Sequence, residues 1–204
     1  MKLHWSPKSP YVRKVMVCLH ELGMDERVER VRSVAAMLKP NPQIMRDNPL
    51  SKIPTLVLDD GTALFDSAVI CEYLDAQARG GLFPAEGNQR WHALRWHAFG
   101  DGLLDVLILW RNETERPAAQ QSDALIEAFQ VKTDASLRQL ESEVPALSAA
   151  PFGIGHIAIG CALGYIDFRF AALPWREQAP RLAECYARIA DRPSFRQTEP
   201  VLEG

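Results

Sequence analysis

Three polar residues at two predicted helix starts could bind an anionic ligand. Ser9 stands directly before Pro10, and Asp66 and Ser67 stand directly before an apolar stretch with helical spacing. Ser and Asp are preferred N-cap residues, and the unpaired N–H groups of a helix N-terminus favour negative charge. A hydroxyl placed there could donate a hydrogen bond to a thiolate or a carboxylate.

The stretch that must position two of these residues runs from residue 48 to residue 74. Ile53-Pro54 precedes the strand formers 55–58, and proline suits a first strand position because it lacks an N–H. Asp60-Gly61 then forms a hairpin-type turn between two apolar runs. We expect a loop, a proline-led hairpin and a helix whose N-terminus is open.

The remaining periodicities predict two different architectures. Before residue 80, strand and helix patterns alternate in the order β-α-β-α-β-β-α, which indicates a mixed α/β sheet. After a Gly- and Pro-rich stretch, only helical patterns remain, which indicates an all-α domain. The prediction is an α/β domain at 1–79, a linker at 80–87 and an all-α domain at 88–204, with helices near 88–115, 119–144, 154–172 and 179–190.

Composition excludes several classes of function. The chain has 204 residues and a formal net charge of −3, which does not favour binding to nucleic acid or to an anionic membrane. No apolar run reaches the roughly 18 residues of a membrane span, and no signal-peptide pattern opens the chain. The four widely spaced cysteines are expected to be buried and reduced, with no metal site. We therefore expect a cytoplasmic protein.

The motifs together resemble the cytosolic glutathione S-transferase family, in a bacterial-type form. The resemblance covers the whole chain and rests mainly on the segment 48–56, the Asp60-Gly61 turn and the segment 65–74. The segments 9–15 and 192–195 support it. It implies a thioredoxin-like N-terminal domain, a cis bond at Ile53-Pro54, an all-helical C-terminal domain and glutathione as cosubstrate.

The resemblance also implies roles for individual residues. The backbone of Ile53 would pair with the cysteinyl part of glutathione, Asp66 and Ser67 would hold the γ-glutamyl end, and Lys52 would face the glycyl carboxylate. Ser9 would donate to the sulfur as the catalytic residue. Each has a plainer alternative, in which the serines and Asp66 only cap helices and Lys52 is an ordinary surface lysine.

The hydrogen bond from one serine hydroxyl is strong enough to stabilise the glutathione thiolate. Lowering a thiol pKa from about 8.5 to about 7 requires about 2 kcal/mol. A hydrogen bond to a charged group contributes about 1.5–3 kcal/mol, and a helix N-terminus about 0.3–1 kcal/mol. Tyr11 is an alternative hydroxyl donor, whereas Ser6 lacks a helix behind it. The five residues that could line an electrophile pocket, or else simply pack in the core, are Trp5, Tyr11, Phe99, Leu103 and Trp110.

One segment departs from the family pattern. The buried helix of the second domain usually opens with a reciprocal capping box, but Gly153 and His156 occupy those positions here. We expect the lost side-chain pair to cost about 1 kcal/mol of stability. An inward-facing Asp167–Arg169 pair is a hypothesis for what fixes this region instead.

The first functional interpretation is a homodimeric glutathione transferase whose thiolate attacks a small electrophile. The same thiolate could serve a glutathione-dependent peroxidase, isomerase or dehalogenase. A third interpretation is a non-catalytic interaction protein that has kept only the fold. The absence of a cysteine near Ser6 and Ser9 argues against dithiol redox chemistry.

Overall fold

The computed structural model describes residues 1–202 and contains two compact units. One unit comprises Met1–Ala93 together with the chain from Pro193 onwards, and the other comprises Leu94–Arg192. The last helix therefore returns to the first unit. The segment from residue 79 to residue 86 is non-helical, and its role as a domain linker stays a prediction.

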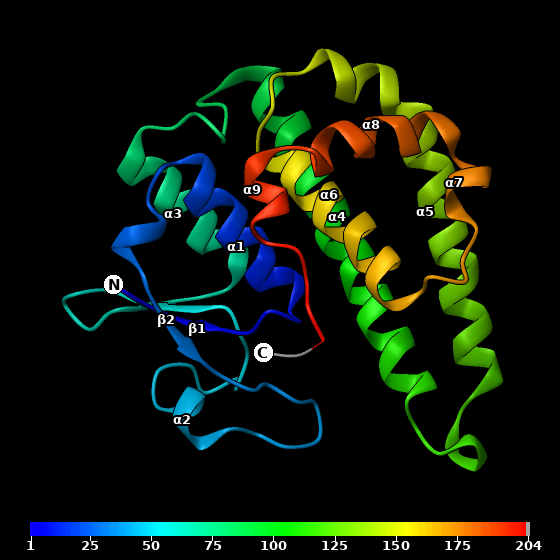
Figure 1. Cartoon of the computed structure of the whole chain (residues 1–204), viewed down its shortest axis with the longest axis horizontal. Coiled ribbons are helices and arrows are strands. Elements are labelled where there is room, and N and C mark those ends of the chain that lie inside the picture. The colour runs from blue at the N-terminus through cyan, green and yellow to red at the C-terminus, as the bar shows by residue number, and fades with distance from the viewer. Residues whose placement is uncertain (203–204) are drawn as a thin grey trace. The chain divides into compact units, whose positions relative to one another are not determined.

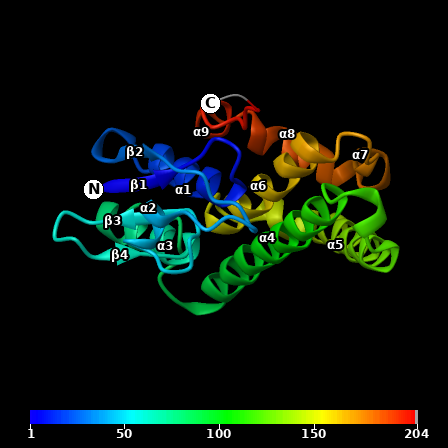
Figure 2. The same ribbon diagram turned by 90° about the horizontal axis from the view of Figure 1, so that it is seen from below.

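A four-stranded mixed sheet forms the centre of the first unit (Figures 1 and 2). Its strands are β1 (Lys2–Trp5), β2 (Glu29–Arg32), β3 (Thr55–Val57) and β4 (Ala63–Leu64), in the order β2-β1-β3-β4. β1 pairs with β2 in parallel and with β3 antiparallel, and β3 pairs antiparallel with β4. The mixed sheet predicted from the hairpin and the strand-helix-strand unit is confirmed.

Helices cover this sheet. α1 (Pro10–Glu21) and α3 (Ser67–Ala78) pack against each other, and the short α2 (Pro42–Met45) lies on the opposite side of the sheet in Figure 1. A single-turn 3₁₀ helix spans Asp25–Arg27. The apolar core between sheet and helices includes fully buried residues of each: Leu3, Val15, Leu19, Leu56, Ile70 and Leu74.

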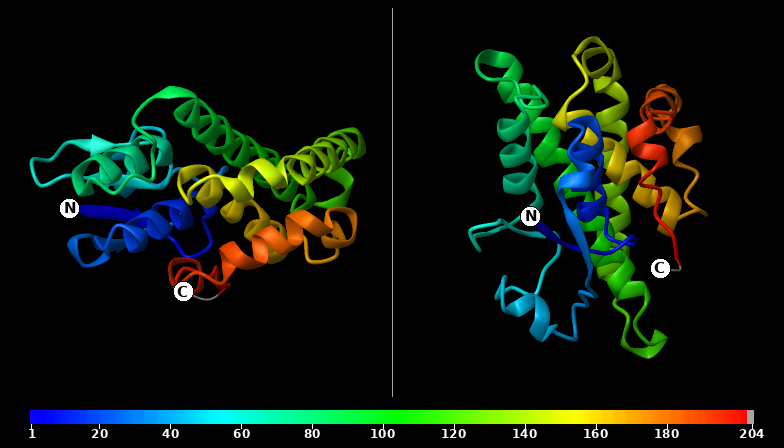
Figure 3. Two further views of the ribbon diagram at one scale, coloured as in Figure 1. Left: turned by 90° about the horizontal axis from the view of Figure 1, so that it is seen from above. Right: turned by 60° about the vertical axis from the view of Figure 1, so that its left-hand side comes forward.

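The final helix, α9 (Pro193–Arg196), lies beside α1 (Figure 3). Arg13 donates from Nη2 to the carbonyl of Phe195 at 3.2 Å, and its guanidinium lies 5.3 Å from the Phe195 ring centroid. These two contacts fasten the end of the chain to the first helix of the same unit.

The second unit is entirely helical over the residues that the structure describes. It contains most of α4 (Gly87–Thr114), a 3₁₀ turn at Ala118–Gln120, α5 (Asp123–Ala149), α6 (Ile154–Arg169), α7 (Trp175–Gln178) and α8 (Pro180–Ala190). α6 is buried along its first thirteen residues, as its apolar sequence predicts. It packs closely on α4, because a Cβ placed on Gly100 would lie 2.5 Å from the carbonyl carbon of Ala158.

A carboxylate joins α4 to α5. Glu143 accepts hydrogen bonds from Arg95, from Trp96 Nε1 at 2.6 Å and from Gln139 at 2.6 Å. Burial acts to raise the pKa of this carboxyl group, but the hydrogen bonds from Arg95, Gln139 and Trp96 lower it to about 2. The group is therefore ionised at neutral pH and crosslinks the two helices.

The prediction that α6 lacks its capping box is correct for only one of the two hydrogen bonds. Gly153 has no side chain to contribute, but His156 Nδ1 accepts from the Gly153 N–H at 3.3 Å. His156 Nε2 lies 2.8 Å from the carbonyl oxygen of Leu147 and must donate to it. A neutral imidazole thus restores the return half of the box and also holds the end of α5.

The hypothesis of an Asp167–Arg169 pair is wrong. Asp167 accepts two hydrogen bonds from Arg176, at 2.6 and 2.7 Å, and a third from Trp175 Nε1 at 2.9 Å. Residues two apart on a helix point in different directions, so Arg169 faces elsewhere. Its guanidinium lies 4.3 Å from the ring centroid of Phe168.

Candidate functional site

Strand register brings the predicted binding residues to one end of the sheet. The antiparallel pair of His4 with Thr55 places the C-terminal end of β1 beside the N-terminal end of β3. The antiparallel pair of Leu56 with Leu64 places the C-terminal end of β4 at that same end of β3. The loop before α1, the segment before β3 and the chain that leads into α3 therefore leave the sheet at the same end.

Ser9 occupies the N-cap of α1. Its Oγ accepts from the Val12 N–H at 3.3 Å, and Pro10 fills the first helical position, as the sequence predicts. Because Oγ acts as the acceptor in this contact, its own proton can point toward a ligand. The structure thus shows the capping role and leaves the donor role possible, so sulfur binding stays a proposal.

The neighbouring Ser6 has a different environment. Its Oγ accepts from Arg32 Nη1 at 3.0 Å and from the Lys8 N–H at 3.4 Å, and the Ser9 N–H donates to the Ser6 carbonyl at 3.3 Å. The Arg32 guanidinium also lies 5.6 Å from the Trp5 ring centroid. This arginine adds positive charge beside the turn that leads to Ser9. Sequence reasoning missed it because only strand pairing brings β2 to this loop.

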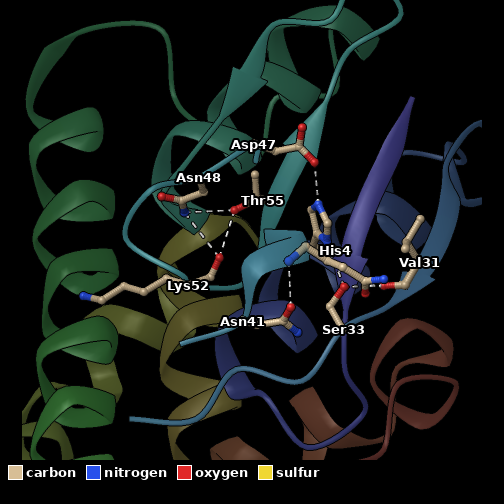
Figure 4. Close-up of polar contacts among 9 residues, drawn as sticks. His4, Val31, Ser33, Asn41, Asp47, Asn48, Lys52 and Thr55 are labelled. Atoms are coloured by element: carbon tan, nitrogen blue, oxygen red, sulfur yellow. Dashed lines mark hydrogen bonds and ion pairs between the residues drawn. The ribbon is translucent and has the colours of Figure 1, made fainter. Parts of the chain in front are cut away.

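The segment before β3 offers its backbone. Ile53 is half-buried, and the Ile53-Pro54 bond is cis, as the resemblance implied. The Lys52 carbonyl accepts from Thr55 Oγ1 at 2.9 Å and from Asn48 Nδ2 at 3.3 Å, while the Lys52 side chain extends away from these contacts (Figure 4). The loop is therefore held by its own side chains, and Lys52 is left with a projecting ammonium group.

Asp66 and Ser67 begin α3. Asp66 is the N-cap, and its Oδ1 accepts from the Ala68 N–H at 2.9 Å; the Phe65-Asp66 bond is also cis. Asp66 is exposed, so its second carboxylate oxygen can accept from a ligand ammonium group. Ser67 is 2% exposed, and its backbone N–H belongs to the first helical turn, which has no intrahelical acceptor.

A polar network anchors the chain shortly before Lys52 and Ile53 (Figure 4). His4 Nδ1 lies 2.8 Å from Ser33 Oγ, and His4 Nε2 lies 2.8 Å from Asp47 Oδ2. The arrangement has the composition of a hydrolytic triad. However, Ser33 is 5% exposed and donates to the Val31 carbonyl at 3.1 Å, which leaves no accessible nucleophile. The network anchors the chain after α2 to β1 and β2.

The sequence did not single out this network. Its members stand 14 to 43 positions apart, and five histidines without regular spacing offer no signal. His4 is buried in the structure. The alternation of side chains along a strand could have predicted this burial, but no other sequence signal points to the network.

The five electrophile-pocket candidates belong to different units. Trp5 and Tyr11 are half-buried in the first unit, and Phe99 is half-buried on α4 in the second. Leu103 and Trp110 are buried, at 2% and 6% exposure, and the Trp110 ring lies 4.6 Å from that of Phe170. The pocket itself stays a prediction.

Within residues 1–202, no cluster of three His, Cys, Asp or Glu side chains could hold a metal ion, and all four cysteines are buried and outside any disulfide. No helix in that range is both long enough and apolar enough to cross a membrane.

Comparison with known proteins gives two family matches. Residues 8–77 match the model of the glutathione S-transferase N-terminal domain, and residues 123–188 match that of the C-terminal domain. A protein of Escherichia coli described as uncharacterised and GST-like, YibF, is 32% identical over 203 residues, covering 98% of each chain.

Solved structures extend the comparison. A glutathione transferase family member from Pseudomonas fluorescens Pf-5, crystallised with bound glutathione, is 42% identical with a TM-score of 0.95, covering 98% of this chain and 99% of that one. A second structure from that organism holds S-(propanoic acid)-glutathione; it is 41% identical with a TM-score of 0.91 and covers 99% of this chain and 100% of that one. A glutathione S-transferase from Methylobacillus flagellatus, with glutathione bound, is 36% identical with a TM-score of 0.89, covering 98% and 99%.

Proposed function

Because the chain belongs to the glutathione S-transferase family, we propose that it is a glutathione transferase whose bound thiolate attacks an electrophilic carbon of a small substrate. The observation that carries the proposal is the convergence of the Ser6–Ser9 turn, Ile53 and the start of α3 at one end of the sheet. A short peptide can pair with the backbone there and place its two charged ends on side chains.

Each part of glutathione has a partner in this arrangement. The Ile53 backbone pairs with the cysteinyl residue, and Lys52 attracts the glycyl carboxylate. The γ-glutamyl carboxylate accepts from the N–H groups that open α3, and its ammonium group donates to Asp66. All of these groups lie in the first unit.

Ser9 then stabilises the thiolate. Its hydroxyl stands at the N-terminus of α1 and is oriented by the Val12 N–H. A charge-assisted hydrogen bond of about 1.5–3 kcal/mol covers the roughly 2 kcal/mol needed to ionise the thiol near neutrality. The positive charge of Arg32, one contact away through Ser6, acts in the same direction. No separate general base is required.

Carbon is the proposed point of attack. The relative from Pseudomonas fluorescens that binds S-(propanoic acid)-glutathione holds a thioether, the type of product that a thiolate forms with an electrophilic carbon. Peroxide reduction, isomerisation and dehalogenation use the same thiolate, so a panel of substrates must separate them. We also propose a homodimer, which light scattering would test.

The proposed binding mode is tested by calorimetry with Asp66→Asn. Asparagine is as good an N-cap as aspartate, so α3 keeps its cap while the site loses its charge. We expect glutathione to bind about tenfold more weakly, equivalent to about 1.4 kcal/mol. Glu26→Gln removes an exposed charge elsewhere in the same unit and should leave the affinity unchanged. Equal affinity in Asp66→Asn and wild type would contradict the assignment, and no binding by wild type would contradict the function.

A further inference from the structure

The Lys52 carbonyl accepts two hydrogen bonds from buried side chains, and these fix the peptide group that precedes Ile53. Thr55 Oγ1 donates to this carbonyl at 2.9 Å, and Asn48 Nδ2 donates to it at 3.3 Å (Figure 4). Thr55 is 0% exposed and Asn48 is 1% exposed. A carbonyl oxygen has two lone pairs, so both are occupied from within the chain.

The contacts of Asn48 define which way its amide is turned. Oδ1 accepts from the Leu50 N–H at 3.0 Å, so Nδ2 is the atom that faces Thr55 Oγ1, 3.0 Å away. Because Nδ2 can only donate, the single hydroxyl proton of Thr55 goes to the Lys52 carbonyl. The Asn48 backbone N–H is itself held by the Ile44 carbonyl at 2.8 Å. Asn48 and Thr55 together form one connected clamp, called here the Asn48–Thr55 clamp.

The Asn48–Thr55 clamp sets the direction of the next backbone N–H group. The Lys52-Ile53 bond is trans, since the cis bonds within the described residues are Ile53-Pro54 and Phe65-Asp66. In a planar trans peptide the C=O and the N–H point in opposite directions. Because the Lys52 carbonyl points into the clamp, the Ile53 N–H points away from it.

The Ile53 N–H has no partner within the chain. Among residues 1–202 no group accepts from it, and Ile53 is half-buried. A backbone N–H without an acceptor costs free energy, so water or a ligand must supply one. A short peptide that pairs with this segment brings such an acceptor in its own carbonyl.

We propose that Asn48 and Thr55 are positioning residues for glutathione: they hold the Lys52-Ile53 peptide so that the Ile53 N–H donates to the cysteinyl carbonyl of the ligand. This role rests on the proposed function, and each residue acts through the Lys52 carbonyl without touching glutathione. Because the peptide plane is fixed before the ligand arrives, binding does not have to order it.

Two substitutions of Thr55 separate its hydroxyl from its packing. Thr55→Val removes the hydroxyl and keeps nearly the same shape, whereas Thr55→Ser keeps the hydroxyl and loses the methyl group. Calorimetry should show glutathione binding about threefold more weakly to Thr55→Val, because Asn48 still donates to the Lys52 carbonyl. Thr55→Ser should recover the wild-type affinity. If Thr55 only filled space, Thr55→Ser would be the weaker binder of the two.

Asn48→Asp removes both donors from the Lys52 carbonyl. The carboxylate still accepts from the Leu50 N–H, but it attracts the Thr55 proton that the carbonyl holds in wild type. We expect glutathione to bind about tenfold more weakly to this variant. In the NMR spectrum of isotopically labelled wild type, saturating glutathione should move the Ile53 amide proton downfield, as a new hydrogen bond does. At saturation this shift should be largely lost in Asn48→Asp, whatever the added charge does to affinity.

A matched substitution controls for the loss of a buried hydroxyl. Thr133 is 0% exposed on α5, and its Oγ1 donates to the Phe129 carbonyl at 2.8 Å. Thr133→Val should keep both the wild-type affinity and the Ile53 shift. Thermal unfolding shows which variants are folded at the assay temperature. If Asn48→Asp is unfolded there, the affinity and the Ile53 shift of the two Thr55 variants decide.

The outcomes distinguish the positioning role from the proposed function. If wild type binds glutathione without a downfield shift of the Ile53 amide, the positioning role is overturned and the proposed function stands. Equal shifts in wild type and folded Asn48→Asp also overturn it, as do equal affinities of Thr55→Val and Thr55→Ser. A shift lost in Asn48→Asp, together with affinity recovered in Thr55→Ser, supports it. If wild type does not bind glutathione, the proposed function falls and the positioning role falls with it.

Discussion

Replacing His156 with glutamine should remove a specific part of the acid sensitivity of folding. In the native state His156 Nδ1 accepts from the Gly153 N–H, and this requires a neutral ring. Burial lowers the pKa of His156, the hydrogen bond to the Leu147 carbonyl opposes this, and the positive charge of Arg192 lowers it further. The Arg192 guanidinium lies 3.7 Å from the ring centroid of Phe152, which itself stacks on His156.

The sign and size of the effect follow from proton linkage. The unfolded chain binds a proton at His156 with a pKa of about 6.5, and the native state resists it, so stability falls as pH falls below that value. The limiting slope for one such group is about 1.4 kcal/mol per pH unit. Between about pH 6.5 and about pH 5.5 the loss at this site is at most about 1 kcal/mol.

His156→Gln keeps the contacts without the titration. A glutamine amide can accept from the Gly153 N–H through its oxygen and donate to the Leu147 carbonyl through its nitrogen. Urea unfolding of wild type and variant at both pH values, at one protein concentration, gives the comparison. All other titrating groups contribute to both proteins and cancel in the difference.

We expect wild type to lose more stability than His156→Gln on acidification, by at most about 1 kcal/mol. If His156→Gln showed the same pH dependence as wild type, the assignment of a neutral, hydrogen-bonded His156 at the start of α6 would be refuted.

Two further changes test the packing of the helical unit. Glu143→Gln should cost about 1.5–3 kcal/mol in urea unfolding, since it weakens hydrogen bonds to an ionised group. In wild type the Glu143 contribution should be complete above about pH 4.5 and disappear as pH falls toward about 2, because the pKa is depressed. Gly100→Ala should lower thermal stability by about 1–3 kcal/mol, since the new Cβ would lie 2.5 Å from the Ala158 backbone. Gly102 lies in the same helix, but a Cβ added to it would meet no atom within 4 Å. Gly102→Ala should therefore raise stability by about 0.5–1 kcal/mol. A loss of stability in Gly102→Ala would contradict the packing explanation for Gly100.

Local chemistry made much of the fold predictable. The Asp60-Gly61 turn, the Ser9 and Asp66 caps and the apolar run of α6 each act within a few residues, and the structure contains all of them. The domain boundary stays a prediction, because it depends on tertiary packing and not on local propensity. The ligand contacts of Ser9, Lys52, Ile53, Asp66 and Ser67 also stay predictions, because they require several segments to contact one ligand.

Long-range polar pairing was not predictable in the same way. The His4–Asp47 contact joins residues 43 positions apart and exists only because α2 folds against the sheet. Asp167 has Arg169 as the nearer arginine in sequence, but helix geometry turns the two apart and Arg176 binds instead. Gly153 and His156 broke a familiar capping pattern, and only the structure reveals that an imidazole can fill half of it.

The ultraviolet absorbance of the glutathione thiolate, titrated with pH on the bound complex, tests the central claim most directly. In wild type the pKa of the bound thiol should lie near 7, well below the usual value of about 8.5. Ser9→Ala should raise it by about 1–2 units, the equivalent of one lost charge-assisted hydrogen bond, with little change in glutathione affinity. Ser6→Ala removes a hydroxyl from the loop before Ser9 and should shift the pKa of the bound thiol much less. A thiolate that forms in Ser9→Ala at the same pH as in wild type would contradict the account.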